Sequence, residues 1–316
     1  MAEVPRNTIL VGDARDRLQR LPESSIDCVV TSPPYFRLRD FGSGIDQIGQ
    51  ERSVDAWAES LRGVFQGVAR VLKPTGSLWL NLADSYSRTP GDGAPNKGLV
   101  LAPERLLLAL AADGWVVRNK LIWAKPNPMP SGVTDRLETT HEFVYFLVRS
   151  ARGYFFDLDA VRSRTTLPDG STKLGANPGD VWRLATAGFR GHTATFPPKL
   201  IERPLLATCP VKLCSACGAP WKTRTTLQRV GNVVRFERDP FVRRHPVRYD
   251  VVRTDPRLQP GCRCLAPTVP GIVLDPFIGA GTVGLVAGDL GRDWLGIEVN
   301  PAFAQIATQR LSEAAA

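Results

Sequence analysis

The sequence predicts an α/β protein built on one large, mostly parallel β-sheet. Two apolar runs, at 26–31 and 271–274, have the composition of buried parallel strands, and a proline-containing turn follows each. The second turn leads into a glycine pattern at 279–284 and then an apolar helix. Open α/β sheets bind ligands beyond the carboxyl ends of their strands, so both turns are candidate binding sites.

The remaining elements follow from apolar periodicity and from proline and glycine punctuation. A proline in the first turn marks two of the expected helices, those at 103–112 and 198–208. Expected strands are 8–11, 77–82, 116–123, 142–148 and 292–297, and expected helices are 14–21, 53–72, 103–112 and 198–208.

Composition narrows the classes of function. The chain has 316 residues, a hydrophobic content of 43% and a net charge of +9. The charge favours a polyanionic partner, although many basic proteins bind no nucleic acid. The sequence has no apolar run long enough to span a membrane and no apolar signal core at its N-terminus. A cytoplasmic location is therefore expected.

The first turn, Ser32-Pro33-Pro34-Tyr35, combines stiffness with polar groups. Two consecutive prolines end the strand because they lack backbone N–H donors and fix the backbone angle φ. A hydroxyl, exposed carbonyls and an aromatic face are thereby held together. This combination suits a planar molecule that carries an amino group, such as a nucleobase, and an ordinary strand-ending loop is the alternative.

The second turn taken alone suggests a dinucleotide site. Gly279, Gly281 and Gly284 match the dinucleotide fingerprint, and Glu298 ends the next strand where it could bind a ribose diol. Only 300–316 remain after it, although such a domain needs several more strands. They must come from the start of the chain, so the sheet would begin at its third strand and finish with its first two.

Together, Ser32-Pro33-Pro34-Tyr35 and Asp275-Pro276-Phe277 with its glycines resemble the S-adenosylmethionine-dependent DNA amino-methyltransferases of the permuted beta group. The resemblance extends from about residue 12 to residue 311, apart from an insert at 209–268. It implies a circularly permuted, Rossmann-like sheet of seven mostly parallel strands with a small cysteine-containing insert. It also implies S-adenosylmethionine as cofactor and double-stranded DNA as substrate, with the target base flipped out of the duplex.

The resemblance divides the chain by role. Residues 1–148 form the catalytic part, and 191–208 with 269–316 form the cofactor-binding part. Residues 149–190 form the target-recognition region, where arginines alternate with Tyr154, Phe155, Phe156 and Trp182. The basic stretch at 36–44 is either a loop that closes on DNA or an ordinary surface loop. Such a protein would act on the nucleoid of a prokaryotic cytoplasm.

The resemblance also assigns site residues. Ser32 and the carbonyl of Pro33 would accept the two hydrogens of the target amino group, beside Pro34, and Tyr35 would stack on the base. Asp13 would contact the adenine of the cofactor, or it caps the following helix. The expected cofactor-binding residues are Asp13, His192, Thr193, Ala194, Asp275, Phe277, Gly279, Gly281, Thr282 and Glu298.

Ser32 also bears on the target base. Within the resembled family, cytosine-N4 enzymes usually carry serine at this place and adenine-N6 enzymes usually carry aspartate or asparagine. Cytosine is therefore expected, with adenine as the alternative. A ring-carbon methyltransferase would need a cysteine after a proline, and no Pro-Cys dipeptide occurs. An NAD-dependent oxidoreductase and a non-catalytic DNA-binding protein are more distant alternatives. The sequence leaves open whether the protein has a cognate restriction endonuclease as partner and whether it forms a homodimer.

The insert at 209–268 differs from the rest in composition. Its Cys214, Cys217, Cys262 and Cys264 form two close pairs, and paired thiolates are the usual ligands of a structural zinc ion. The second pair has one intervening residue rather than two, and disulfides or free thiols are the alternative. Many arginines lie between the pairs, which predicts phosphate contact or a solvated basic hairpin.

Overall fold

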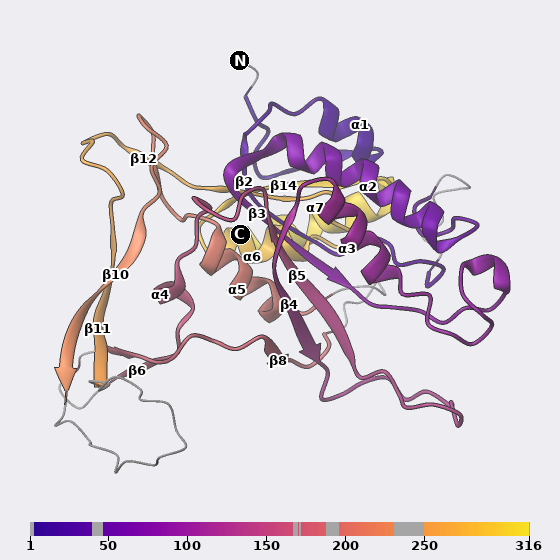
Figure 1. Ribbon diagram of the computed structural model, residues 1–316. Coiled ribbons are helices and arrows are strands. Elements are labelled where there is room, and N and C mark those ends of the chain that lie inside the picture. Colours follow the sequence, from indigo (N-terminus) through magenta and orange to yellow (C-terminus); the bar gives the residue numbers. More distant parts are fainter. Residues whose placement is uncertain are drawn as a thin grey trace, which may run out of the picture.

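A computed structural model describes residues 3–39, 47–166, 170, 172–187, 196–230 and 250–315 (Figure 1). Its centre is an eight-stranded sheet with the strand order β1-β14-β13-β2-β3-β5-β4-β8. All neighbouring pairs are parallel except those that β5 makes with β3 and β4. The strands are β1 (Thr8–Val11), β14 (Asp293–Glu298), β13 (Ile272–Asp275), β2 (Ile26–Thr31), β3 (Leu72–Leu82), β5 (His141–Val148), β4 (Val116–Ala124) and β8 (Val181–Arg183).

This topology confirms the predicted α/β fold with one large, mostly parallel sheet. The C-terminal strands β13 and β14 lie between β1 and β2, so the end of the chain completes the sheet that its beginning starts. The sheet has one strand more than predicted, because β8 pairs with the edge of β4. A three-residue strand is too short to produce a periodicity signal.

Helices cover both faces of the sheet (Figure 1). Side chains of β2 alternate between two cores: Val29 packs with α1, α2 and α3, whereas Cys28 and Val30 pack with α5 and α6. Burial on both faces explains why every residue of β2 is buried and why most of them are apolar, with Asp27 and Thr31 as the polar exceptions. The helices are α1 (Ala14–Gln19), α2 (Val54–Val71), α3 (Ala102–Ala112), α4 (Leu158–Val161), α5 (Pro198–Thr208), α6 (Thr282–Asp289) and α7 (Pro301–Ala315), with a 3-10 turn at Pro90–Asp92. None of these helices is long and apolar enough to cross a membrane.

A smaller sheet stands beside this body and is here called the arm (Figure 1). It joins parts of two segments that the sequence separates, the predicted recognition region and the insert, because β7 pairs with β11. The apolar periodicity around 164–174 is too weak to predict these strands or their pairing. The arm consists of β10 (Lys222–Val230), β11 (Asp250–Gln259), β7 (Thr172–Leu174) and β6 (Arg164–Thr166), and the pair β9 (Leu213–Cys214) with β12 (Thr268–Val269) lies at its base.

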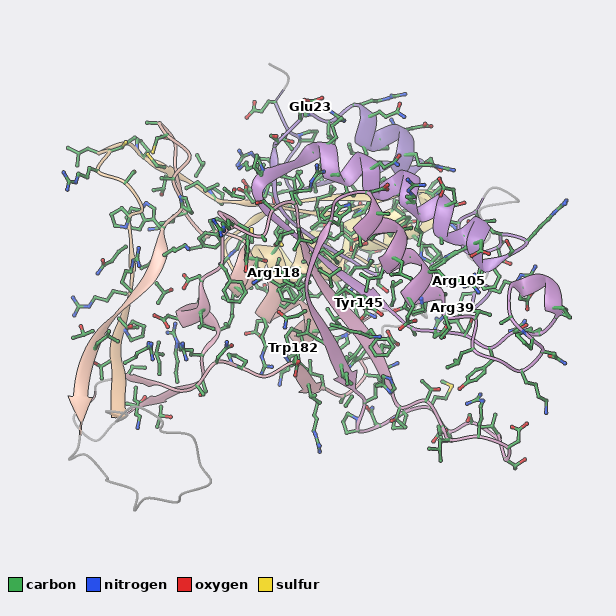
Figure 2. All side chains as sticks on the ribbon, in the orientation of Figure 1. Glu23, Arg39, Arg105, Arg118, Tyr145 and Trp182 are labelled. Carbon is green, nitrogen blue, oxygen red and sulfur yellow. The ribbon has the colours of Figure 1, made fainter. Side chains whose placement is uncertain are left out.

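The aromatic residues that were predicted to read bases are packed in the main body of the protein and are not in the arm. Trp182 and Phe155 are both buried, and the rings of Tyr154 and Phe156 pack against Phe146 at 5.8 Å each. Figure 2 labels Trp182 near the strands of the central sheet. Trp182, Tyr154 and Phe156 belong to or pack against the second core, and Phe155 is also buried, so these rings reflect packing and do not by themselves indicate base recognition.

Asp27 fastens the C-terminal strands to the N-terminal ones. Its buried carboxylate accepts a hydrogen bond from the backbone N–H of Ile272 at 2.9 Å, at the start of β13. It also pairs with the ammonium group of Lys73 at 2.7 Å. A buried carboxylate requires such partners, because an unpaired one would cost several kcal/mol.

We expect Asp27→Ala to lower the free energy of unfolding by about 1–3 kcal/mol, since the buried N–H of Ile272 loses its acceptor. Urea unfolding followed by circular dichroism measures the change. Asp55→Ala serves as the control, because Asp55 is an exposed carboxylate paired with Arg105 and should cost less than about 1 kcal/mol. Equal losses for the two variants would contradict the role given to Asp27.

Candidate active site

The turn after β2 is braced on two sides. The indole N–H of Trp57 donates to the carbonyl of Pro34 at 2.9 Å. Gly49 approaches from another segment with φ at +105°, and a Cβ there would lie 3.1 Å from both the Cβ of Pro34 and the carbonyl oxygen of Tyr35. A side chain at this position would therefore disturb the turn, which the sequence predicted to be stiff.

A chain of hydrogen bonds runs from Ser32 into the protein. The Ser32 hydroxyl donates to the phenol oxygen of Tyr35 at 3.0 Å, and the phenol donates to Oε2 of Glu142 at 2.8 Å. Burial of the phenol, reinforced by the negative charge of Glu142, raises the pKa of Tyr35 well above its ordinary value. The phenol thus keeps its proton, and its hydroxyl is held in one orientation.

Two further side chains complete this network. Asn81 donates from Nδ2 to the phenol oxygen of Tyr35 at 2.8 Å and to Glu142 at 2.6 Å. Lys125 pairs with the other carboxylate oxygen of Glu142. Oδ1 of Asn81 is buried and has no hydrogen-bond partner among the described residues.

The sequence analysis missed Glu142, Asn81 and Lys125. A polar residue at the end of the apolar strand β3 could have indicated Asn81. Glu142 is the second residue of β5. This strand runs antiparallel to its neighbours, so its amino end lies at the edge where the parallel strands have their carboxyl ends. That position becomes visible only once the direction of the strand is known.

Asp275 ends β13 beside the end of β2. Its carboxylate accepts from the hydroxyl of Thr31 at 2.7 Å and from the backbone N–H of Phe277 at 3.0 Å. Burial raises the pKa of Asp275 to about 7, against the opposing effect of these two hydrogen bonds. The turns that follow the two strands are therefore neighbours at one edge of the sheet.

The glycine turn is tied to Glu298. The Glu298 carboxylate accepts from the backbone N–H of Gly279 at 3.0 Å and of Asn300 at 2.9 Å. Burial raises the pKa of Glu298, although these hydrogen bonds lower it in part. Gly279 has φ at +50°. The carboxylate is thus oriented by the backbone on both sides, at the carboxyl end of β14.

The later glycines of the pattern serve packing. A Cβ on Gly281 would lie 3.0 Å from the side chain of Leu311, and one on Gly284 would lie 3.0 Å from the ring of Trp294. These glycines therefore let α6 approach α7 and β14 closely. The hydroxyl of Thr282 accepts from Arg310 at 3.0 Å.

Asp13 has the geometry of a helix cap. Its carboxylate accepts from the backbone N–H of Arg15 at 2.7 Å and also pairs with the guanidinium group of that residue. These contacts hold the pKa of Asp13 below its ordinary value. The preceding residue, Gly12, donates its N–H to the carbonyl of Glu298 at 2.8 Å, so the cap lies beside the end of β14.

The predicted cofactor residues His192, Thr193 and Ala194 lie outside the described residues. The chain resumes at Phe196, which packs against the second core. Phe196 lines a small cavity of about 10 Å³ together with Thr31 and Asn81. The segment that leads into α5 therefore approaches the same edge of the sheet as the two turns.

A larger cleft of about 730 Å³ opens next to the first turn. Its lining starts at Phe36, directly after Tyr35, and continues through 84–88 and parts of 129–139. Arg37 anchors this wall, because its guanidinium group pairs with Asp92 and donates to the carbonyl of Arg52 at 3.1 Å. Most of the predicted loop at 36–44 lies outside the described residues, but this anchored beginning is part of the cleft.

Comparison with known proteins identifies relatives of the whole chain. The N6_N4_Mtase family model, described as DNA methylase, matches residues 26–212 and 267–309. The unmatched interval between them contains most of the insert. Type II methyltransferase M.SmaI of Serratia marcescens is 32% identical, over 96% of this chain and 90% of that protein. Type II methyltransferase M.Cfr9I of Citrobacter freundii is 34% identical, over 96% and 87%.

Solved structures share the fold. The PvuII DNA methyltransferase, described as cytosine-N4-specific, superposes with a TM-score of 0.60 at 17% identity, over 97% of this chain and 90% of that one. A putative DNA modification methylase of Thermus thermophilus, in complex with S-adenosyl-L-methionine, gives 0.55 at 21% identity, over 97% and 95%.

The raised pKa of Asp275 predicts a pH dependence of stability. A carboxyl group whose pKa is about 7 in the folded state and 3.8 as an ordinary value stabilises the fold most at low pH. That contribution is lost as the pH rises through about 7. We expect Asp275→Asn to remove this dependence, because asparagine has no ionisable group. Between about pH 5 and about pH 8, the free energy of unfolding of the variant should therefore rise relative to that of the wild type by on the order of 3 kcal/mol.

Urea unfolding of the ligand-free protein at both pH values measures this gain. Asp293→Asn is the control, since Asp293 is partly exposed at the other end of β14 and pairs with Arg6. A wild-type and an Asp275→Asn protein with parallel pH profiles would show that Asp275 titrates normally.

Proposed function

The chain belongs to the N6/N4 family of DNA methylases, and on that premise we propose that it methylates N4 of cytosine in double-stranded DNA with S-adenosylmethionine. One observation carries the proposal: the hydrogen bond between Thr31 and Asp275 sets the Ser32 turn beside the end of β13. The group to be methylated and the methyl donor would thus meet at one edge of the sheet. Membership of this family also excludes the alternative of an NAD-dependent oxidoreductase.

The residues at the ends of β13 and β14 fit an adenosyl cofactor. Glu298 is a backbone-oriented carboxylate, and each of its oxygens retains acceptor capacity for the hydroxyls of a ribose. Asp275 and the Gly279 turn lie at the neighbouring strand end. When bound, S-adenosylmethionine supplies an electrophilic methyl group on a positively charged sulfur.

Ser32 is prepared to act as a hydrogen-bond acceptor. Its own proton is directed at Tyr35, whose proton is directed at Glu142, so the free lone pairs of the Ser32 oxygen are left for a donor. Pro33 offers a backbone carbonyl next to it, while the carbonyl of Pro34 is occupied by Trp57. Two acceptors on an exocyclic amino group would draw its nitrogen toward a tetrahedral geometry, which frees the nitrogen lone pair from conjugation with the ring and makes it more nucleophilic. Because these two acceptors are already in place before the reaction, they need not reorganise as the transition state forms.

The choice of cytosine rests on Ser32. A hydroxyl is a weaker acceptor than the carboxylate usual in adenine-N6 enzymes of the resembled family. The PvuII enzyme, described as cytosine-N4-specific, has the same fold and supports this preference as a comparison. Adenine N6 is the second candidate, because the matching family covers both chemistries.

The arm is our candidate for contact with DNA outside the active site. Each of its four strands carries an exposed basic side chain: Arg164, Lys173, Arg224 and Arg257. Arg224 and Arg257 lie directly opposite each other across the β10–β11 pair. Like charges in that position destabilise a sheet, so a polyanion on this face would relieve their repulsion.

Relatives named as Type II methyltransferases suggest a role in restriction and modification. We propose a cognate endonuclease as the functional partner and the bacterial nucleoid as the site of action. We also propose that residues 1–148 carry catalysis, and that 191–208 with 269–316 bind the cofactor. Target recognition would then lie in 149–190 and in the arm, which joins this region to the insert at 209–268.

We expect Asp275→Ala and Glu298→Ala to weaken S-adenosylmethionine binding by at least about tenfold, since each removes a carboxyl group from the site. Isothermal titration calorimetry measures the affinity, and Asp293→Asn at the opposite end of β14 should leave it unchanged. Wild-type affinity in both alanine variants would remove these residues from the cofactor site.

We expect Ser32→Ala to lower the rate of methyl transfer by roughly tenfold or more while cofactor affinity stays within about twofold, because the acceptor is needed most in the transition state. Transfer of a tritiated methyl group to DNA measures the rate. Ser25→Ala, at the amino end of β2, is the matched control. Unchanged turnover in Ser32→Ala would exclude the proposed role.

Nucleoside chromatography of the methylated DNA identifies the target base. The expected label is in N4-methyl-2′-deoxycytidine. A labelled peak at N6-methyl-2′-deoxyadenosine alone would overturn the choice of cytosine and leave the amino-methyltransferase function intact.

A further inference from the structure

Four cysteine side chains from the two ends of the insert converge on one point. The sulfur atoms of Cys214, Cys217, Cys262 and Cys264 all lie within 4.8 Å of one another. The sulfurs of Cys217 and Cys264 are 3.7 Å apart. A tetrahedral zinc ion with bonds of about 2.3 Å to sulfur requires about 3.8 Å between its ligands. The spacing of the sulfurs is therefore close to that of the ligands around one tetrahedral ion.

Disulfides do not account for this arrangement. All four cysteines are free, and a disulfide would bring its two sulfurs to about 2 Å. Two disulfides would also group the sulfurs into pairs, whereas here all four are mutual neighbours. Cys28 and Cys209, the remaining cysteines, are buried in the core and are not part of the cluster.

The first cysteine pair lies on a tight turn. The N–H of Gly218 donates to the carbonyl of Cys214 at 2.8 Å, and Gly218 has φ at +71°. The sulfur of Cys214 faces the backbone N–H groups of Ala216 and Cys217. The turn thus places the two cysteines of this pair close together.

The second pair is held against the first by backbone contacts. Cys214 in β9 pairs with Thr268 in β12, and the N–H of Ser215 donates to the carbonyl of Pro267 at 2.9 Å. A Cβ on Gly261 would lie 2.2 Å from the carbonyl oxygen of Pro220, so only glycine permits this approach. The fold thus brings both pairs together where the arm begins and ends.

We propose that Cys214, Cys217, Cys262 and Cys264 bind one structural zinc ion that clamps the base of the arm. Four protein ligands fill a tetrahedral site and leave no position for a reactive water, so the ion has a structural and not a catalytic role. The arm strands β10 and β11 start and finish within a few residues of these ligands. The ion therefore fixes the start of β10 relative to the end of β11, while Asp157 ties Thr223 of β10 to the main body at 2.7 Å.

Elemental analysis of the full-length protein, produced in zinc-containing medium, tests the site directly. We expect about one zinc per chain in the wild type and in Ser215→Ala, whose changed side chain lies between the first two ligands. The double variant Cys262→Ser with Cys264→Ser should lose most of the metal. X-ray absorption at the zinc edge of the wild type should give four sulfur neighbours at about 2.3 Å.

Several results would overturn the proposal. They are a wild-type protein that binds S-adenosylmethionine but contains no zinc, iron in place of zinc, nitrogen or oxygen ligands in the absorption spectrum, or full zinc content in the double variant. The absorption measurement uses only the wild type, so it decides the matter even if the variant fails to fold.

Limited proteolysis distinguishes the clamp from a merely bound ion. Removal of zinc by a chelator should speed cleavage within the insert at least about fivefold, and re-addition of zinc should restore protection. Unchanged cleavage would refute the clamping role. These readouts are independent of methyl transfer, so the zinc site and the proposed function can fail separately.

Discussion

The pairing of β2 with β13 is the constraint on which the rest of the structure depends. It joins residues that are more than two hundred positions apart in sequence, and it is reinforced by Asp27 at one end and by Thr31 with Asp275 at the other. Because the strands are parallel, their carboxyl ends fall at the same edge. The Ser32 turn and the Asp275 turn become a single site only through this pairing.

Much of this was predictable from the sequence because the relevant signals are local. Buried parallel strands are mostly apolar, as Ile26–Thr31 is, and the prolines and glycines after β2 and β13 mark sharp turns. The two turns can therefore be predicted from the sequence, whereas their proximity cannot. The cysteine pairs were equally visible, because metal ligands recur at short spacings.

What the sequence could not provide depends on contacts between distant segments. Glu142 reaches Tyr35 only because β5 runs antiparallel to its neighbours, and strand direction is not encoded in local periodicity. Lys125 joins the network through its pairing with Glu142. The pairing of β7 with β11 joins a three-residue strand to a ten-residue strand far away in the sequence, and neither one indicates its partner. Aromatic residues at 154–156 were misleading, since burial in a core and stacking on a base require the same side chains.

The strand order also has a consequence for how the protein is made. During synthesis β1 and β2 leave the ribosome long before β14 and β13, which separate them in the sheet. Until then the edge of β2 that will pair with β13 lacks its partner, and unpaired edges of mostly apolar strands promote aggregation. The central sheet is therefore completed only when β13 and β14 insert between β1 and β2. A chain that stops before β13 would lack the site between the two turns and would keep an unpaired edge on β2. We expect cellular proteases to degrade such a chain quickly.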